Sequence, residues 1–262
     1  MKAVTGVFAS QTDAQHALEQ LRALSLPEDR LTFLTPGNAA TQNTAPAVAG
    51  EQSGMGKAIG ALVGTAAGFS AGPLLIAVLI PGVGPITALG LLGGAIAAAA
   101  GASVGAIAGG KIENNLTDGL PEDELFVYED ALRKGRSVVI AMAGDENEAS
   151  RFRELLNTEG AETVDAAREQ WWIGLRSAEQ EHYSTHGRKF GDDEKFYRMG
   201  FEAALHSRMR CKEYDQVMGE MNAKIDELEQ QHPGTKAGEA FRRGYERGRD
   251  HYQQLCNESK AA

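Results

Sequence analysis

The residues best suited to chemistry lie in the last third of the chain. Glu179, His182 and His186 stand at i, i+3 and i+7, and the two imidazoles could share one face of a helix. Histidine nitrogens on one helix face are ligands for transition metals. The spacing is not the His-Glu-x-x-His pattern of metalloproteases. We therefore interpret the two histidines as surface residues and expect neither a metal nor a catalytic site.

A thiolate site is the second candidate for chemistry. Cys211 and Cys256 have histidines nearby in the sequence, His206 and His251. Structural zinc sites need a close pair of cysteines, and this chain has none, so we predict no zinc and no cofactor. Two cysteines do not make a disulfide framework and suit a reducing cytoplasm, with a single bridge as the alternative.

A phosphate-binding loop is suggested by Gly54-Met55-Gly56-Lys57. Glu51 stands where that motif requires its first glycine, and Ala58 replaces the Ser or Thr after the lysine. We reject the loop on these two departures. No Ser/His/Asp order and no paired-carboxylate motif stands out either, so we predict that the protein is not an enzyme and takes no small-molecule substrate.

A basic and aromatic cluster near the C-terminus is typical of contacts with nucleic acid or anionic lipid. Its members are Phe241, Arg242, Arg243, Tyr245, Arg247, Arg249 and Tyr252. Acidic residues alternate with these arginines (Glu239, Glu246, Asp250), so we predict a self-paired, solvated helix face. The net charge of −10 is concentrated in residues 1–165, which carry −9. This excludes general affinity for nucleic acid and attraction to anionic lipid by charge alone.

An internal repeat organises residues 166–262. The segment Tyr197-Arg198-Met199-Gly200-Phe201-Glu202 matches Phe241-Arg242-Arg243-Gly244-Tyr245-Glu246, 44 residues later, in the pattern aromatic-Arg-x-Gly-aromatic-Glu. We predict an all-α C-terminal module built from two related units. The motif glycines predict close helix contact and the aromatics a core. The pair Trp171-Trp172 is interpreted as a packing anchor in preference to a membrane-interface residue pair.

The elements of the first 165 residues alternate between strand and helix patterns. Strands are predicted at 3–9, 31–35, 137–143 and 163–164, and helices follow Ser10, Pro121 and Asp145. Residues 1–37 with 119–165 therefore predict an α+β domain, a small ferredoxin-like sandwich, with a short doubly wound sheet as the alternative. Residues 38–55, rich in Ala, Thr, Asn, Gln and Gly, predict a flexible linker.

An uncharged run of 53 residues, 58–110, interrupts this domain. Pro81, Gly82, Gly84 and Pro85 break it into two halves of 23 and 25 residues, and about 20 residues suffice for a helix to cross a bilayer core. We predict that residues 56–111 form a helical hairpin, a putative pair of transmembrane helices with its turn at these four residues. The alternative is a hairpin buried in a soluble oligomer.

Small residues recur every four positions in both halves of the run. The predicted helix-packing interface, a glycine zipper, consists of Gly60, Gly64, Gly68, Gly72, Gly101, Gly105 and Gly109. Lines of glycine allow helix backbones to approach closely in membranes. In water each glycine would cost a helix about 1 kcal/mol relative to Ala, so packing must compensate.

The motifs around this run resemble bacterial general stress proteins, whose relatives are called low-temperature-induced proteins. The resemblance rests on Ile80-Pro81-Gly82-Val83-Gly84-Pro85, on Gly119-Leu120-Pro121-Glu122-Asp123-Glu124 and on the segment 128–135, and it covers about residues 1–165. It implies a stress-associated, membrane-linked bacterial protein. It carries no catalytic residue to this chain and does not extend to the C-terminal third.

These observations predict a non-enzymatic stress-response protein that acts by membrane association, by self-assembly into a homo-oligomer, or by both. The lysines that flank the run, Lys57 and Lys111, place both termini in the cytoplasm if the hairpin lies in the inner membrane. The alternative is a cytoplasmic, soluble homo-oligomeric scaffold that buries its hairpins in a shared core. The expected partners are further copies of the chain and a lipid bilayer.

Overall fold

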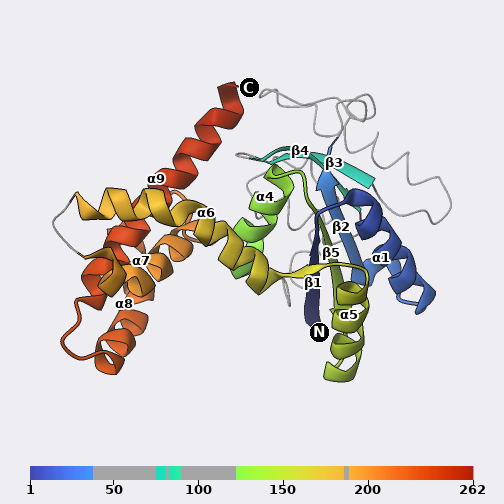
Figure 1. Cartoon of the computed structure of the whole chain (residues 1–262), viewed down its shortest axis with the longest axis horizontal. Coiled ribbons are helices and arrows are strands. Elements are labelled where there is room, and N and C mark those ends of the chain that lie inside the picture. Colours follow the sequence, from blue (N-terminus) through green and yellow to red (C-terminus); the bar gives the residue numbers. More distant parts are fainter. Residues whose placement is uncertain (38–74, 81–82, 90–121, 186–188, 262) are drawn as a thin grey trace, which may run out of the picture. The chain divides into compact units, whose positions relative to one another are not determined.

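The computed structural model describes residues 1–37, 75–80, 83–89, 122–185 and 189–261 (Figure 1). The chain has a mixed α+β architecture with a helical C-terminal region. It divides into two compact units. The front unit comprises residues 1–121 and 128–167, and the helical module comprises residues 122–127 and 168–262.

The front unit is built on one antiparallel sheet. Its described elements are β1 (Lys2–Phe8), α1 (Gln11–Ala23), the 3-10 turn η1 (Glu28–Arg30), β2 (Leu31–Pro36), β3 (Leu75–Ile80), β4 (Gly84–Leu89), β5 (Ser137–Ala143), α5 (Glu146–Thr158) and β6 (Glu162–Thr163). The described strands follow the order β3-β4-β2-β5-β1-β6 across the sheet. Each neighbouring pair is antiparallel, with Val4 opposite Ala141 and Val78 opposite Ile86.

The two helices that connect strands begin where the sequence predicts them. The side chain of Ser10 accepts hydrogen bonds from the backbone of Thr12 and Asp13 at the start of α1. The Asp145 carboxylate accepts one from the backbone N–H of Glu148, 2.8 Å away, at the start of α5. These caps satisfy backbone donors that a first helical turn leaves without partners. Each helix therefore begins at a defined residue and is held in place against the sheet.

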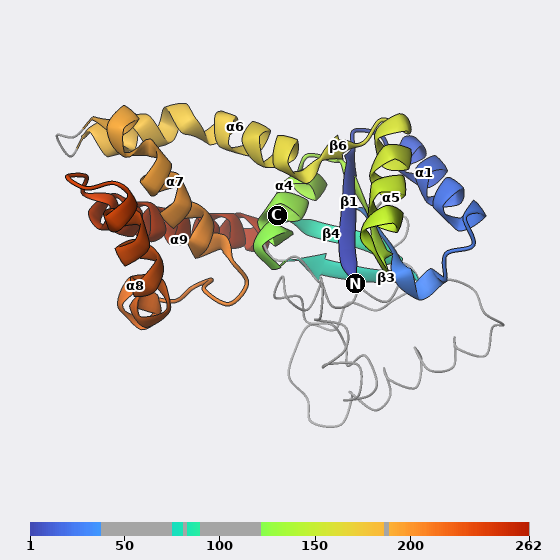
Figure 2. The same ribbon diagram turned by 90° about the horizontal axis from the view of Figure 1, so that it is seen from below.

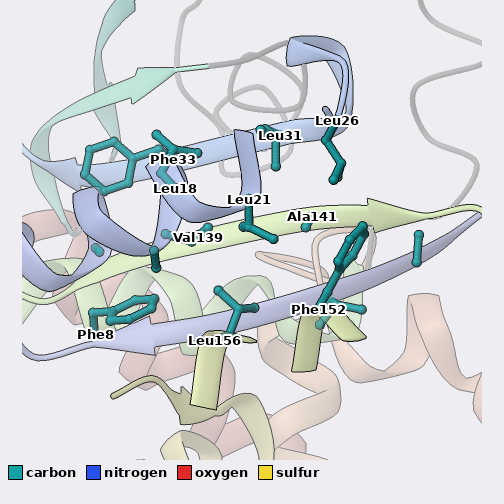
Figure 3. Close-up of a cluster of buried hydrophobic side chains, with 14 of the residues drawn as sticks. Phe8, Leu18, Leu21, Leu26, Leu31, Phe33, Val139, Ala141, Phe152 and Leu156 are labelled. Atoms are coloured by element: carbon teal, nitrogen blue, oxygen red, sulfur yellow. The ribbon is translucent and has the colours of Figure 1, made fainter. Parts of the chain in front are cut away.

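One face of the sheet is covered by α1 and α5, which lie side by side (Figures 1 and 2). Figure 3 shows the apolar cluster between the helices and the strands. Its larger members are Phe8, Leu18, Leu21, Leu31, Phe33, Val139, Phe152 and Leu156, each exposed by 5% or less. Burying such a side chain contributes about 1.5–3 kcal/mol. This cluster is therefore the main source of stability on that face.

The second face of the sheet is buried as well. Every residue of β5 is buried, so this strand has apolar neighbours on both sides. Helix α4 (Leu125–Arg133) follows the 3-10 turn η3 (Glu122–Glu124). The hydroxyl of Tyr128 on α4 lies 3.0 Å from that of Thr5 on β1. The Thr5 side chain is on the face opposite the α1/α5 cluster, because successive side chains of a strand point to opposite faces. A strand buried on both faces has a continuous apolar sequence, as Ser137–Ala143 does.

The predicted helical hairpin is wrong in the part that the structure describes. Residues on both sides of Pro81-Gly82 are strands: β3 and β4 pair in a β-hairpin, with the Val83 N–H donating to the Ile80 carbonyl 3.1 Å away. Gly84 and Pro85, predicted in the turn, belong to β4. The β-branched sequence of 75–80 suits a strand, and Pro-Gly suits the centre of a tight turn as well as it breaks a helix. Pro81, Gly82 and the glycine lines lie outside the described residues.

The strands also shorten the segments available for the predicted spans. Before β3 only residues 58–74 of the uncharged run are left, 17 residues, at the lower limit for a helix that crosses a bilayer core. In the parts of the chain that the structure describes, no helix combines the length and the apolar character that a membrane crossing requires.

The helical module is formed by α6 (Val164–Ser184), α7 (Phe190–Leu205), α8 (Tyr214–Gln231) and α9 (Ala237–Ala261). The first four residues of α6 belong to the front unit. In chain order these helices form two consecutive pairs, α6–α7 and α8–α9, and the most extensive packing is between α7 and α9. Each pair contains one copy of the repeated motif, in α7 and in α9.

Candidate functional site

The candidate site lies where the two motif copies meet, between α7 and α9 (Figure 2). A Cβ atom added to Gly200 would lie 1.9 Å from the carbonyl oxygen of Phe241. A Cβ added to Gly244 would lie 1.9 Å from the carbonyl oxygen of Tyr197. The two contacts are reciprocal, because Phe241 and Tyr197 hold the same position in their motifs. The motifs therefore cross each other with local two-fold pseudosymmetry, and glycine is required at both.

The motif arginines and glutamates repeat this symmetry. Arg198 donates from Nε to Glu202, 2.7 Å away, and Arg242 donates from Nε to Glu246, 2.9 Å away. The Arg198 guanidinium lies 5.6 Å from the ring centre of Trp172 on α6. The equivalent Arg242 lies 5.1 Å from the ring centre of Tyr214 on α8. Each motif therefore places its arginine over an aromatic ring of the helix before it, a favourable cation–π geometry.

A buried carboxylate breaks the symmetry. Glu179 on α6 is only 1% exposed. Its Oε2 accepts a hydrogen bond from the Tyr197 hydroxyl at 2.7 Å and one from Nε of Arg247 at 3.0 Å, and Oε1 lies 3.2 Å from the same Nε. A carboxylate leaves water at a high cost unless charged and hydrogen-bonding partners replace the solvent. Glu179 thus connects the first motif, through Tyr197, to the second helix pair, through Arg247.

Electrostatics in this site follow from burial and from the Glu179 charge. Burial raises the pKa of Tyr197, and the hydrogen bond to Glu179 raises it further. Burial alone would lower the pKa of Arg247, but the hydrogen bond and the charge of Glu179 outweigh it and the pKa is raised. Tyr197 stays neutral and Arg247 stays charged at physiological pH. Both oxygens of the carboxylate are engaged, and we interpret the group as a structural connection in the module.

The second motif tyrosine anchors the connection between the helix pairs. The hydroxyl of Tyr245 lies 3.0 Å from the carbonyl oxygen of Met209 and 3.2 Å from that of Lys212, which follow α7. The side chain is fully buried, and burial raises its pKa to about 12. In the first motif the equivalent position is Phe201, which has no hydroxyl. Each motif thus contributes one tyrosine and one phenylalanine, in opposite order.

The predicted packing role of the tryptophans agrees with their burial. Trp171 and Trp172 are 4% and 3% exposed. The ring centre of Trp171 lies 4.7 Å from that of Phe126 and 5.8 Å from that of Phe201, and Trp172 Nε1 donates to Glu194 at 3.0 Å. Tryptophan in a core usually has a hydrogen-bond partner for its N–H, as here. The pair fills the core of the module.

The histidine and cysteine candidates do not come together as sites. Glu179 is in the core and His186 lies outside the described residues. Within the described ranges, no group of three or more His, Cys, Asp or Glu side chains is arranged to hold a metal ion. Cys211 is exposed, with a φ of +62°, and Cys256 is half-buried on α9; neither forms a disulfide within the described residues. Glu179 is buried, and its spacing from His182 and His186 in the sequence carries no signal for that burial.

The arginines of α9 pair with acidic residues, as the self-paired interpretation predicts. Arg242 pairs with Glu246, Arg243 with Glu239, and Arg249 with Asp250 and Glu213. Arg247 pairs with the buried carboxylate of Glu179. The alternation of charges along the sequence is sufficient to predict the contacts with Glu246, Glu239 and Asp250, whereas Glu213 lies 36 positions from Arg249. The Arg247 contact bridges 68 positions in the chain, and local sequence carries no signal for it.

Comparisons were made with models of protein families, with curated proteins and with solved structures, and none of them matches this chain.

Proposed function

We propose that this chain is a non-enzymatic bacterial stress-response protein that acts through self-assembly. The observation that carries the proposal is the place of β3 and β4: both strands come from the middle of the uncharged run, and β4 pairs with β2 of the front unit. The run is therefore attached to a folded domain by backbone pairing. An uncharged, apolar segment fixed in this way is suited to contacts with further copies of the same chain. The stress-response role rests on the sequence resemblance.

We also propose that the polar groups of the module are not catalytic. The buried carboxylate of Glu179 is occupied by Tyr197 and Arg247, and the motif arginines are each paired and stacked. These contacts favour a packing role. We propose on the same grounds that the protein uses no cofactor and no metal. The acidic front half also disfavours nucleic acid as a partner.

Membrane association is the second candidate, and one observation favours it: the run of 53 residues without a charge. In that version the protein lies at the bacterial inner membrane with both termini in the cytoplasm. The pairing of β3 and β4 with the sheet favours the first version, a homo-oligomeric scaffold in the cytoplasm. Cys211 and Cys256 form no disulfide in the described part of the chain, which suits a reducing compartment.

Two measurements test the proposal. The native mass of protein purified without detergent is expected to exceed that of one chain and to rise with concentration. In fractionated cells the protein is expected in the soluble fraction, and an alkaline carbonate wash is expected to release any of it that sediments with the membranes. A native mass of one chain at every concentration contradicts self-assembly. Resistance to carbonate, with detergent needed for purification, selects the membrane candidate.

We also propose that the front unit is a ferredoxin-like sandwich enlarged at one edge. The four strands in the order β2-β5-β1-β6 support this, with α1 between β1 and β2 and α5 between β5 and β6. In this interpretation β3 and β4 extend the sheet beyond β2. A solved structure whose helices lie on opposite faces of the sheet contradicts it.

A further inference from the structure

The outer edge of β3 is the strongest candidate for an interface. Among the described residues, β3 pairs with β4 on one side, and no strand pairs with its other side. We infer that β3 pairs antiparallel with β3 of a second copy, so that two sheets join edge to edge about a two-fold axis. This inference rests on the proposed self-assembly and names the contact through which it occurs.

The prolines of the hairpin identify the backbone groups that face outward. Antiparallel strands alternate between pairs that exchange hydrogen bonds and pairs that do not. Pro85 has no N–H, so it does not exchange hydrogen bonds with its partner Leu79. The neighbouring pair Val78–Ile86 therefore does exchange them. The pair Pro36–Ile86 on the other side of β4 agrees, because Pro36 also lacks an N–H. The N–H and C=O groups of 75, 77 and 79 consequently point away from β4.

The two edges of the sheet differ in how they are protected. Natural proteins block free edges with short strands, charges, prolines or bulges. At the far edge β6 has two residues, Glu162 and Thr163, and Glu162 forms an ion pair with Arg136 before the chain enters α6. The β3 edge has six residues, Leu-Ile-Ala-Val-Leu-Ile, without a charge, a glycine or a proline. Within the described residues, β6 therefore has features that block pairing with another strand, and the sequence of β3 has no charge or proline that would do so.

The chemistry of β3 selects a second copy as the occupant. The strand has no charge with which to recognise a charged peptide, and its apolar sequence is matched by its own. An antiparallel pair centred on Ala77 sets Leu75 of one copy opposite Leu79 of the other. In that register each outward N–H meets an outward C=O, and the arrangement closes as a dimer. The edge would then no longer be available for further strands.

A proline at the centre of the edge tests the inference. Ala77→Pro removes the outward N–H and leaves the groups that bind β4 in place, because proline is tolerated on edge strands. Ala77→Gly is the matched control, since it keeps the N–H. By sedimentation velocity, the proline variant is expected to need at least about tenfold more protein than the wild type for half-assembly. The glycine variant is expected to assemble within about threefold of the wild type.

A cross-link locates the contact independently of that variant. In a Cys211→Ser, Cys256→Ser background, Ala77→Cys places two thiols at the two-fold axis, where paired Cα atoms lie about 5.5 Å apart, within disulfide range. Leu75→Cys is the control on the same side of the strand, about 13 Å from its own copy at roughly 3.3 Å per residue. Mild oxidation is expected to give a covalent dimer with Ala77→Cys and not with Leu75→Cys.

The outcomes separate the two proposals. If the wild type assembles, the Ala77→Pro variant assembles equally well and Ala77→Cys gives no covalent dimer, the β3 contact is overturned. The proposal of self-assembly is then unaffected. A wild type that is monomeric at every concentration overturns both. If the Ala77→Pro variant does not fold, the cross-link decides. Protection of the Ala77 amide from hydrogen exchange in a dilute, monomeric sample means that the chain covers its own edge, and this also overturns the inference.

Discussion

The two units of this protein are stabilised in different ways. In the front unit, two capped helices cover a sheet, and the apolar cluster around Leu21 and Phe152 is at their contact. Its ion pair Lys2–Glu146 lies at the surface. In the helical module, two helices touch at their backbones and a carboxylate is buried among aromatic rings. The comparison shows that tolerance to substitution depends on whether a contact is made by side chains, which can move, or by backbone, which cannot.

The largest expected effect follows from the backbone contact. Gly200→Leu or Gly244→Leu places a Cβ 1.9 Å from a carbonyl oxygen of the facing helix, and no rotamer can relieve the clash. We expect a loss of about 4 kcal/mol or more of unfolding free energy, at the upper end for single substitutions. Both tryptophans of the chain belong to the module, so their fluorescence during urea unfolding reports on this unit.

A third glycine provides the matched control. Gly219 lies within α8, and a Cβ there would have no atom within 4 Å. Gly219→Ala is expected to stabilise the module by about 0.5–1 kcal/mol through helix propensity. If Gly200→Leu unfolds at the same urea concentration as the wild type, the close crossing of α7 and α9 does not exist.

The buried carboxylate gives the next effect. Glu179→Ala leaves Tyr197 and Arg247 without their shared acceptor, and breaking a buried ion pair costs about 3–5 kcal/mol. We expect the lower end, about 3 kcal/mol, because Arg247 is 22% exposed. The surface pair of the front unit is the comparison: Lys2→Ala is expected to change the unfolding free energy by less than about 1 kcal/mol. Equal costs for the two substitutions would contradict the burial of Glu179.

An alkaline titration tests the other buried hydroxyl. The pKa of Tyr245 is raised from 10.0 to about 12 by burial, so between those values the folded chain keeps a proton that the unfolded chain releases. The contribution of the protonated Tyr245 hydroxyl to the unfolding free energy is complete below pH 10 and is lost as pH rises toward 12. Tryptophan fluorescence against urea at pH 9 and pH 11.5 is expected to show this loss. In Tyr245→Phe the loss between the two pH values should be smaller, and an unchanged loss assigns it to other groups.

Local sequence predicted most of the front unit and little of the contacts inside the module. Ser10, Asp145 and the run 137–143 carry their signals within a few residues, and their elements were found. The helix prediction is wrong at β3 and β4 because an apolar segment of six residues suits a strand and part of a helix equally, and periodicity cannot separate the two. The motif glycines predicted a close helix contact. Their reciprocal partners, and the burial of Glu179 by residues 18 and 68 positions away, depend on tertiary structure.

The smallest expected effect is a pH dependence in the front unit. His16 on α1 forms a surface ion pair with Glu159, the residue after α5, and that hydrogen bond and charge raise the pKa of His16 above 6.5. The stabilisation is complete below pH 6.5 and is lost as pH rises through the raised value. Unfolding followed by backbone amide signals of β1 and β5 is expected to show slightly lower stability at pH 8.5 than at pH 6. His16→Gln should remove this difference and leave the tryptophan transition of the module unchanged. If the pH dependence persists in His16→Gln, the His16–Glu159 pair does not cause it. The pH dependence would then not be an effect of a surface ion pair, and it could not be used in the comparison of the two units.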